Sequence, residues 1–198
     1  MTSRGRPASR QDLARSDGLT ILELLIALTL LAVVVGGLYR FVATGSQSAR
    51  LTNNFLQIQA QTRAALDNVV DEIRWGQQVT AAGPTSVTVL VPQATPFSAA
   101  SPYTVTFAYD AAADAVTRQE DPDAGGPLPA GPAEPVAYFI VLKDGSNGLA
   151  LEYFDDGGNA LGAAPADPSV IARVHITLTA TLNQTSRTLI GDTALRGR

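Results

Sequence analysis

The chain has 198 residues, with 18 acidic against 14 basic side chains and no cysteine. That length suits one modest domain with an appendage, and the acidic balance argues against a nucleic-acid-binding body, which would present a basic face. Without cysteine there are no disulfides and no thiol nucleophile, so core packing and sheet hydrogen bonds must hold an exported domain together.

The N-terminal 40 residues fall into a polar part and an apolar part. The first 18 residues carry four arginines against two aspartates, whereas Leu19–Tyr39 is apolar apart from Glu23, and Arg40 closes the run. About 20 apolar residues in a helix span the ~30 Å hydrocarbon layer of a membrane. Because the arginines precede the run, the positive-inside rule places the N-terminus in the cytoplasm and the rest of the chain outside it.

Glu23 is the unusual residue of this apolar run. An ionised carboxylate in hydrocarbon is costly, so an acidic residue within a membrane helix indicates a function by default. Glu23 also lies only one turn into the run, where its side chain could extend toward the headgroups. Position alone leaves both interpretations open.

The residues that lead up to Glu23 resemble the processing motif of type IV prepilins and type II secretion pseudopilins; they read Gly18-Leu19-Thr20-Ile21-Leu22-Glu23. In that family a membrane prepilin peptidase cuts after the glycine and methylates the new N-terminal residue. The resemblance assigns the cut to Gly18, the methylated amine to Leu19 and a role in filament assembly to Glu23. Leu19 departs from the pattern, in which Phe or Met usually follows the cut.

The resemblance also implies how such a chain works. Glu23 of one subunit would pair with the Leu19 amine of a neighbour and set the register of packed helices, because two buried charges that meet lose less free energy than two that stay apart. The implied role is structural and not enzymatic. The implied partners are prepilin peptidase, other pilins or pseudopilins, an inner-membrane assembly platform and, before assembly, the lipid bilayer. The chain would be a single-pass inner-membrane protein and later part of a pilus or periplasmic filament.

A second helical segment follows the apolar run. Gly36 and Gly37 interrupt the run, either as a site that bends or melts on assembly, as in related filaments, or as glycines that a membrane helix tolerates or uses for close packing. Beyond them, apolar residues recur every three or four positions, which predicts an amphipathic helix that ends near Trp75, with Gly76 as a left-handed cap. The predicted buried stripe is Leu51, Phe55, Ile58, Thr62, Ala65, Leu66, Val69 and Ile73.

The remaining residues, 77–198, alternate in the manner of β-strands. This pattern predicts an α+β fold, with a long N-terminal helix packed on a meander-type antiparallel sheet. The predicted segments are a leader at 1–18, a transmembrane or filament-core helix at 19–43, an amphipathic helix at 44–76 and a β-rich head at 77–198. The predicted strands are 85–91, 103–109, 115–119, 136–142, 149–154, 170–180 and 187–190.

Three segments of the head, 149–155, 171–178 and 194–196, resemble PilW-like minor pilins and J-type pseudopilins, which favours a minor subunit. The predicted function is a minor subunit of a type IV pilus or pilus-like filament that supports assembly and thereby motility, adhesion or DNA uptake. A type II secretion pseudopilin that drives protein export and a signal-anchored periplasmic binding protein are the alternatives.

The head offers few residues for chemistry. Asp155, Asp156 and Asn159 lie in a Gly-rich turn whose oxygen atoms are of the type that binds calcium. They lack EF-hand spacing, and Asp, Gly and Asn are also what hairpin turns require, so we favour a turn over a calcium site. His175, the only histidine, alternates with apolar neighbours in a predicted strand, which favours a solvent-facing residue over a catalytic one. We expect no catalytic residues and no cofactor. The scattered arginines of the mature chain do not indicate direct nucleic-acid binding.

Overall fold

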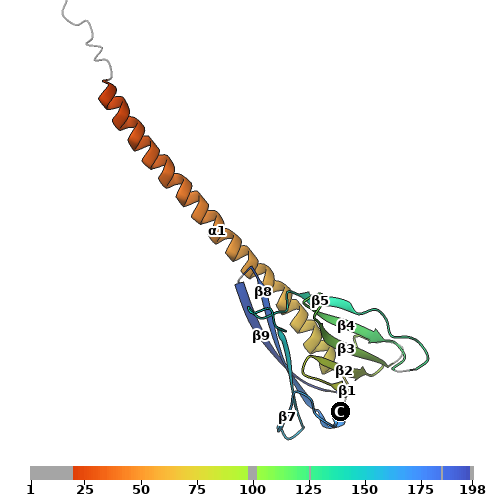
Figure 1. The fold of residues 1–198 in the computed structure, drawn as a ribbon. Helices are drawn as coiled ribbons and strands as arrows, with labels where there is room; N and C mark the ends of the chain where they lie inside the picture. The colour runs from red at the N-terminus through yellow and green to blue at the C-terminus, as the bar shows by residue number, and fades with distance from the viewer. Residues whose placement is uncertain (1–19, 98–101, 125, 184, 197–198) are drawn as a thin grey trace, which may run out of the picture. The chain divides into compact units, whose positions relative to one another are not determined.

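The computed structural model describes residues 20–97, 102–124, 126–183 and 185–196 (Figure 1). The proposed cleavage residues Gly18 and Leu19 and the rest of the leader lie outside the described residues. The chain divides into two units, Met1–Ser48 and Ala49–Arg198. The helix α1 (Ile21–Arg74) contributes its first part to one unit and its second part to the other.

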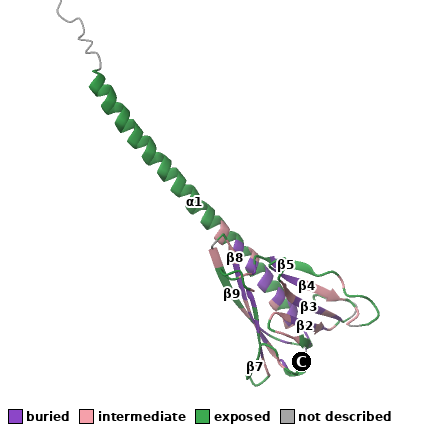
Figure 2. Cartoon of the chain, viewed as in Figure 1, coloured by how far each residue is buried: buried purple, intermediate pink, exposed green. Residues whose placement is uncertain are grey.

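In the first unit, every described residue, from 20 to 48, is exposed (Figure 2). Among the residues that the structure describes, α1 is the one helix long and apolar enough to cross a membrane by length and composition. An apolar helix without a protein partner is typical of a membrane span, because lipid then takes the place of a core.

In the second unit, the remaining part of α1 buries one stripe against the strands. The predicted stripe is confirmed from Ile58 onward, whereas Leu51 is exposed. The buried stripe also includes a charged residue, Glu72, which lies between Val69 and Ile73 on the same face. The helical period therefore identified the right face of the helix but not everything on it.

The strands form two antiparallel sheets, so the α+β pilin-like fold is confirmed but the single meander sheet is wrong. The first sheet has the order β1-β2-β3-β4-β5, and the second has the order β7-β6-β8-β9, preceded at β8 by the short 3-10 helix η1. Their bounds are β1 (Gln78–Ala82), β2 (Ser86–Val91), β3 (Tyr103–Asp110), β4 (Ala115–Asp121), β5 (Glu134–Tyr138), β6 (Leu149–Phe154), β7 (Ala160–Gly162), η1 (Pro168–Val170), β8 (Arg173–Leu182) and β9 (Thr185–Ala194).

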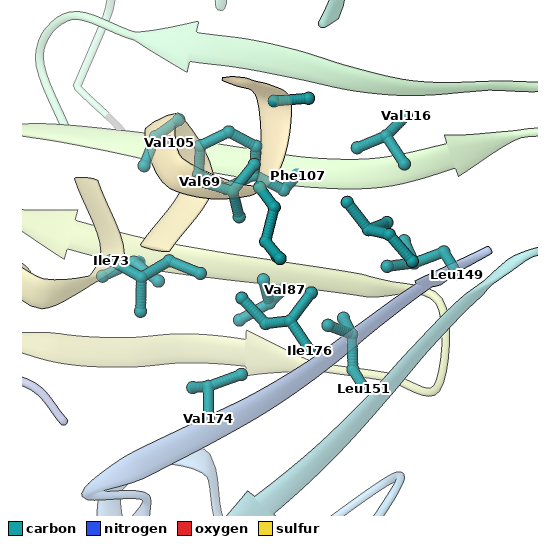
Figure 3. Close-up of a cluster of buried hydrophobic side chains, with 14 of the residues drawn as sticks. Val69, Ile73, Val87, Val105, Phe107, Val116, Leu149, Leu151, Val174 and Ile176 are labelled. Atoms are coloured by element: carbon teal, nitrogen blue, oxygen red, sulfur yellow. The ribbon is translucent and has the colours of Figure 1, made fainter. Parts of the chain in front are cut away.

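The core of the second unit lies between α1 and the two sheets. Figure 3 shows Val69 and Ile73 of α1 among apolar side chains from strands of both sheets. Tyr153 of β6 joins the sheets, since its hydroxyl donates to the carbonyls of Gly83 (2.8 Å), in the β1–β2 turn, and of Ser86 (3.0 Å), at the start of β2. Burial raises the pKa of Tyr153 to about 12, which keeps the phenol neutral and able to donate.

Several predicted strand boundaries differ from the structure for local reasons. The strand predicted at 136–142 ends at Tyr138, because Phe139 takes a left-handed backbone conformation with φ of 61°. Val170 belongs to η1, and β8 begins three residues later. The short strands β1 and β7 were not predicted, since five and three residues carry little periodicity.

Gly76 follows the helix as predicted, but it is not left-handed. A Cβ at this position would collide with Cγ1 of Val89 and would lie 2.9 Å from the carbonyl oxygen of Ile73. Glycine is thus needed here for the close approach of β2 to the helix end, and not for a cap.

Candidate functional site

The start of α1 carries a reciprocal cap built from Thr20 and Glu23. The Glu23 N–H donates to Thr20 Oγ1 at 3.2 Å, and Glu23 Oε2 accepts from the Thr20 N–H at 2.9 Å and from its hydroxyl at 3.1 Å. The Leu24 N–H donates to the Thr20 carbonyl at 3.1 Å and begins the helical ladder. This is a capping box, in which the first residue and the third helical residue each satisfy a backbone donor of the other.

The capping box gives Glu23 a role within its own chain. One carboxylate oxygen, Oε2, is taken up by Thr20, while Oε1 has no hydrogen bond among the described residues. Sequence reasoning missed this role, although threonine three residues before glutamate at the start of an apolar run is its signature. Thr20 therefore holds the Glu23 carboxylate through Oε2 and leaves Oε1 without a hydrogen bond to a described residue.

The apolar surface of the first unit begins at this cap. Side chains around the whole circumference of α1 are more than half exposed, including Leu22 (67%) and Val33 (72%). A Cβ added at Gly36 or Gly37 would meet nothing within 4 Å. The first part of α1 is therefore apolar around its whole circumference, with two glycines on its surface, and none of the described residues covers it. The bend predicted as one option for these glycines is untested.

The second unit holds a buried carboxylate, Glu72, whose side chain is 4% exposed. Arg118 of β4 binds it with two nitrogens, Nε to Oε2 at 2.8 Å and Nη2 to Oε1 at 2.6 Å. The hydroxyl of Tyr103 on β3 donates to the same Oε1 at 2.6 Å. Arg118 also contacts Glu120 through Nη2 at 2.8 Å. Three donors on two strands thus neutralise and fix a single carboxylate on the helix.

This cluster links α1 to the first sheet in a defined register. Burial and the adjacent Glu72 carboxylate raise the pKa of Tyr103 well above its usual range, so its hydroxyl remains a donor. The hydrogen bond to Glu72 raises the pKa of Arg118, which stays charged. Sequence reasoning missed the cluster because Glu72 was not distinguished from the polar face. Its spacing from Val69 and its place beside Ile73 would have put it on the buried stripe.

The predicted calcium turn has a simpler geometry. Both carboxylate oxygens of Asp155 accept from Asn159, at 2.8 Å from its backbone N–H and 2.9 Å from its side chain. These hydrogen bonds lower the pKa of Asp155. Gly158 takes the left-handed conformation that the turn needs, with φ of 78°. Among the described residues, no group of three or more acidic or histidine side chains could hold a metal ion, and Asp155 and Asp156 form no such group.

His175 lies half-buried on β8, on the face opposite the core residues Val174 and Ile176. Its cross-strand neighbours are Glu152 and Asp192. In the described part of the chain, His175 belongs to no group of three or more acidic or histidine side chains that could hold a metal.

A comparison with protein families matches residues 13–39 to the prokaryotic N-terminal methylation motif. The matched residues include Gly18, Glu23 and the whole apolar run Leu19–Tyr39. The motif implies processing by a prepilin peptidase, and with the apolar helix it indicates inner-membrane anchoring before assembly. Proteins of this kind are structural and not enzymatic. No curated protein matches the chain.

Proposed function

We propose that this type IV prepilin-like protein is a minor subunit of a type IV pilus or pilus-like filament, cut after Gly18 and assembled through α1. The observation that carries the proposal is the methylation motif at residues 13–39, which runs into the first part of α1, where every described residue up to Ser48 is exposed. In this proposal the leader at 1–18 is removed, 19–43 lies first in lipid and then in the filament core, and 44–76 and 77–198 form the exported head.

The exposed apolar cylinder supports this proposal physically. A contiguous apolar surface of this extent on a soluble protein would favour aggregation. A helix is one of the few structures that satisfies all of its backbone groups in lipid, so the same segment is stable in a bilayer. A bundle of like helices then replaces lipid by protein without changing the polarity around each side chain.

Glu23 supports an assembly role through Oε1, which has no hydrogen bond among the residues that the structure describes. We propose that cleavage creates an amine at Leu19 and that Glu23 Oε1 of a neighbouring subunit accepts from it. Thr20 holds the other oxygen, so the carboxylate is oriented before assembly. A buried ion pair of this kind specifies register more than it adds stability.

The resemblance of three head segments to minor pilins supports a minor rather than a major subunit. These segments correspond to β6, the first part of β8 and the end of β9 with the two residues after it, so all three lie in or directly beside the second sheet. A type II secretion pseudopilin shares every feature above. Neighbouring genes for a secretin and for secreted enzymes would favour that alternative, and genes for a retraction motor would favour the pilus.

The proposal predicts the outcome of replacing Glu23 by Gln and by Ala in the native host. Both variants keep Gly18 and Leu19, so mass spectrometry should find the mature N-terminus at Leu19 in each. Gln retains an oxygen that caps the Thr20 N–H but has no charge, whereas Ala loses both. If the ion pair assembles the filament, both variants should enter sheared filament fractions about tenfold less than the wild type.

Two results would overturn this assignment. Normal incorporation of Glu23→Gln together with poor incorporation of Glu23→Ala would leave Glu23 as a helix cap only. An intact Met1 terminus in cells with an active prepilin peptidase would instead support a signal-anchored periplasmic protein. Thr20→Val is the matched control, since it weakens the cap while it leaves the carboxylate and the new amine in place.

A further inference from the structure

The two sheets of the head have four edge strands, and three of them are irregular. The pairing of β1 shifts register between Val79 and Ala81, β5 contains Pro135, and β7 has only three residues and a shift of its own. Irregularity, proline and short length are the devices that keep an edge from pairing with another strand. The fourth edge, β9, has none of these: its ten residues pair with β8 without a shift.

The hydrogen-bond pattern of β9 identifies the backbone groups at its open edge. In an antiparallel pair only alternate residues bond across the ladder. The Leu195 N–H donates to the Ala172 carbonyl at 3.0 Å, which makes the odd-numbered residues of β9 the ones that bond to β8. The even-numbered residues direct their N–H and C=O groups away from β8, and these groups have no partner among the described residues. They are Ser186, Thr188, Ile190, Asp192 and Ala194.

A groove of about 240 Å³ runs between this edge and α1. On the helix side, Leu66 and Val70 line it, together with the exposed ion pair of Arg63 and Asp67 at 3.5 Å. On the strand side, Ile190 is 63% exposed at the centre of the open edge. The groove thus combines an apolar lining, a charged rim and a row of backbone groups without a described protein partner, which is the arrangement that an added strand pairs with.

The direction of β9 decides against a second copy of this chain as the occupant. The strand advances along α1 in the same direction: Arg187 lies over the ring of Phe55 at 5.6 Å, and the Arg196 N–H donates to the Arg74 carbonyl at 2.9 Å. Antiparallel pairing of two β9 strands would therefore set the two α1 helices antiparallel. Chains anchored in one membrane with the same orientation do not meet in that way, and the other edges of a second copy are irregular.

We propose that the open edge of β9 receives an extended strand from a different polypeptide, which extends the second sheet beside α1. The partner chemistry follows from the groove: an apolar or β-branched side chain opposite Ile190, and a side chain on the other face that contacts Leu66 and Val70. The identification of this polypeptide as another subunit of the same filament rests on the proposed function; the strand addition itself does not.

Photo-crosslinking in the native host tests the inference on the full chain. A benzophenone amino acid is placed in turn at Thr188, Ile190 and Asp192, and as a control at Glu152, an exposed residue of β6 in the same sheet. Strand addition predicts that the three β9 positions all form adducts with one segment of a different chain. Each move of the probe by two residues along β9 should move the crosslinked residue of the partner by two residues along that segment. Glu152 should give no such adduct.

A matched pair of variants separates the backbone from the side chain. Ile190→Pro removes the outward N–H without touching the ladder to β8, a position where edge strands tolerate proline; Ile190→Ala removes only side-chain atoms. We expect the adduct yield from Thr188 to fall about tenfold in the proline variant and about twofold in the alanine variant. Ile190→Lys, which charges the edge without altering the backbone, should also lower the yield strongly.

Three results would overturn the inference: adducts only between copies of this chain, adducts that do not step along one segment, or equal yields in the proline and alanine variants. The N-terminus of the same samples distinguishes this from the proposed function. Cleavage at Leu19 without the ladder of adducts rejects the strand addition alone. The ladder without cleavage rejects the filament assignment and leaves the strand addition standing.

Discussion

At the scale of single residues, the two side chains of the Glu72–Arg118 ion pair are buried to different extents. The Glu72 side chain is 4% exposed and the Arg118 side chain 30%. Without Arg118, Glu72 would be a buried carboxylate with Tyr103 as its remaining donor. Without Glu72, Arg118 would still have Glu120 and water. Removal of one partner from a buried pair is costly mainly through the charge left behind.

This asymmetry predicts that Arg118→Met lowers the free energy of unfolding by about 3 kcal/mol or more, and Glu72→Gln by only about 1–2 kcal/mol. The measurement is urea unfolding of the purified chain in detergent micelles, followed by tryptophan fluorescence of Trp75. The double variant Glu72→Gln with Arg118→Met should recover part of the loss. Equal losses in the two single variants would contradict the unequal burial.

At the scale of elements, two close approaches depend on glycine. Gly148, just before β6, is enclosed by backbone: a Cβ there would collide with the carbonyl oxygen of Thr179 and lie 2.7 Å from the carbonyl carbon of Ile140. A Cβ added at Gly191 of β9 would meet side chains instead, at 2.7 Å from Val70 Cγ2 and 2.9 Å from Leu66 Cδ1. Side-chain ends move more easily than backbone, so the two positions differ in tolerance.

We therefore expect Gly148→Ala to destabilise the head by about 2–3 kcal/mol and Gly191→Ala by about 1 kcal/mol. Thermal unfolding followed by circular dichroism measures both. Gly36→Ala is the control, because open space surrounds that glycine and the head should unfold at an unchanged temperature. A larger loss of stability for Gly191→Ala than for Gly148→Ala would contradict this expectation. It would show that the side chains of Val70 and Leu66 cannot move aside for a methyl group on β9.

At the scale of the whole molecule, the buried core and the apolar cylinder belong to different units. Every residue of the buried core lies between Ile58 and Leu195, in the second unit. The described residues of the first unit bury nothing. The folding free energy of the chain therefore comes from the second unit, while the first unit draws its stability from its surroundings.

This division predicts that the fragment 49–198 folds by itself. It should unfold cooperatively at a temperature within about 3 °C of the full chain in detergent micelles, and it should remain soluble without detergent. Calorimetry of the two proteins gives the comparison. A fragment 77–198, which lacks the buried stripe of α1, is the matched control and should not unfold cooperatively.

The sequence alone determined the features that depend on local pattern. The motif at Gly18 to Glu23, the apolar run, the buried face of α1 from Ile58 onward and the strand β6 could all be read from residues close together in the chain. Hydropathy and periodicity report such features directly, because one helix turn or one strand pleat contains the information. The sequence also contained the capping signature of Thr20 and Glu23, which was overlooked.

Only the tertiary structure decided the rest, because it depends on residues far apart in the chain. Glu72 is 31 residues from Tyr103 and 46 from Arg118, so its helical spacing could place it on the buried stripe but no local pattern could identify its partners. The first sheet ends at β5, where Phe139 takes a left-handed backbone conformation, and Tyr153 then links the second sheet to the first. The open edge of β9 exists because β8 covers one side of the strand and nothing described covers the other. Which strand lies at an edge is a property of the whole sheet and not of the strand's own residues.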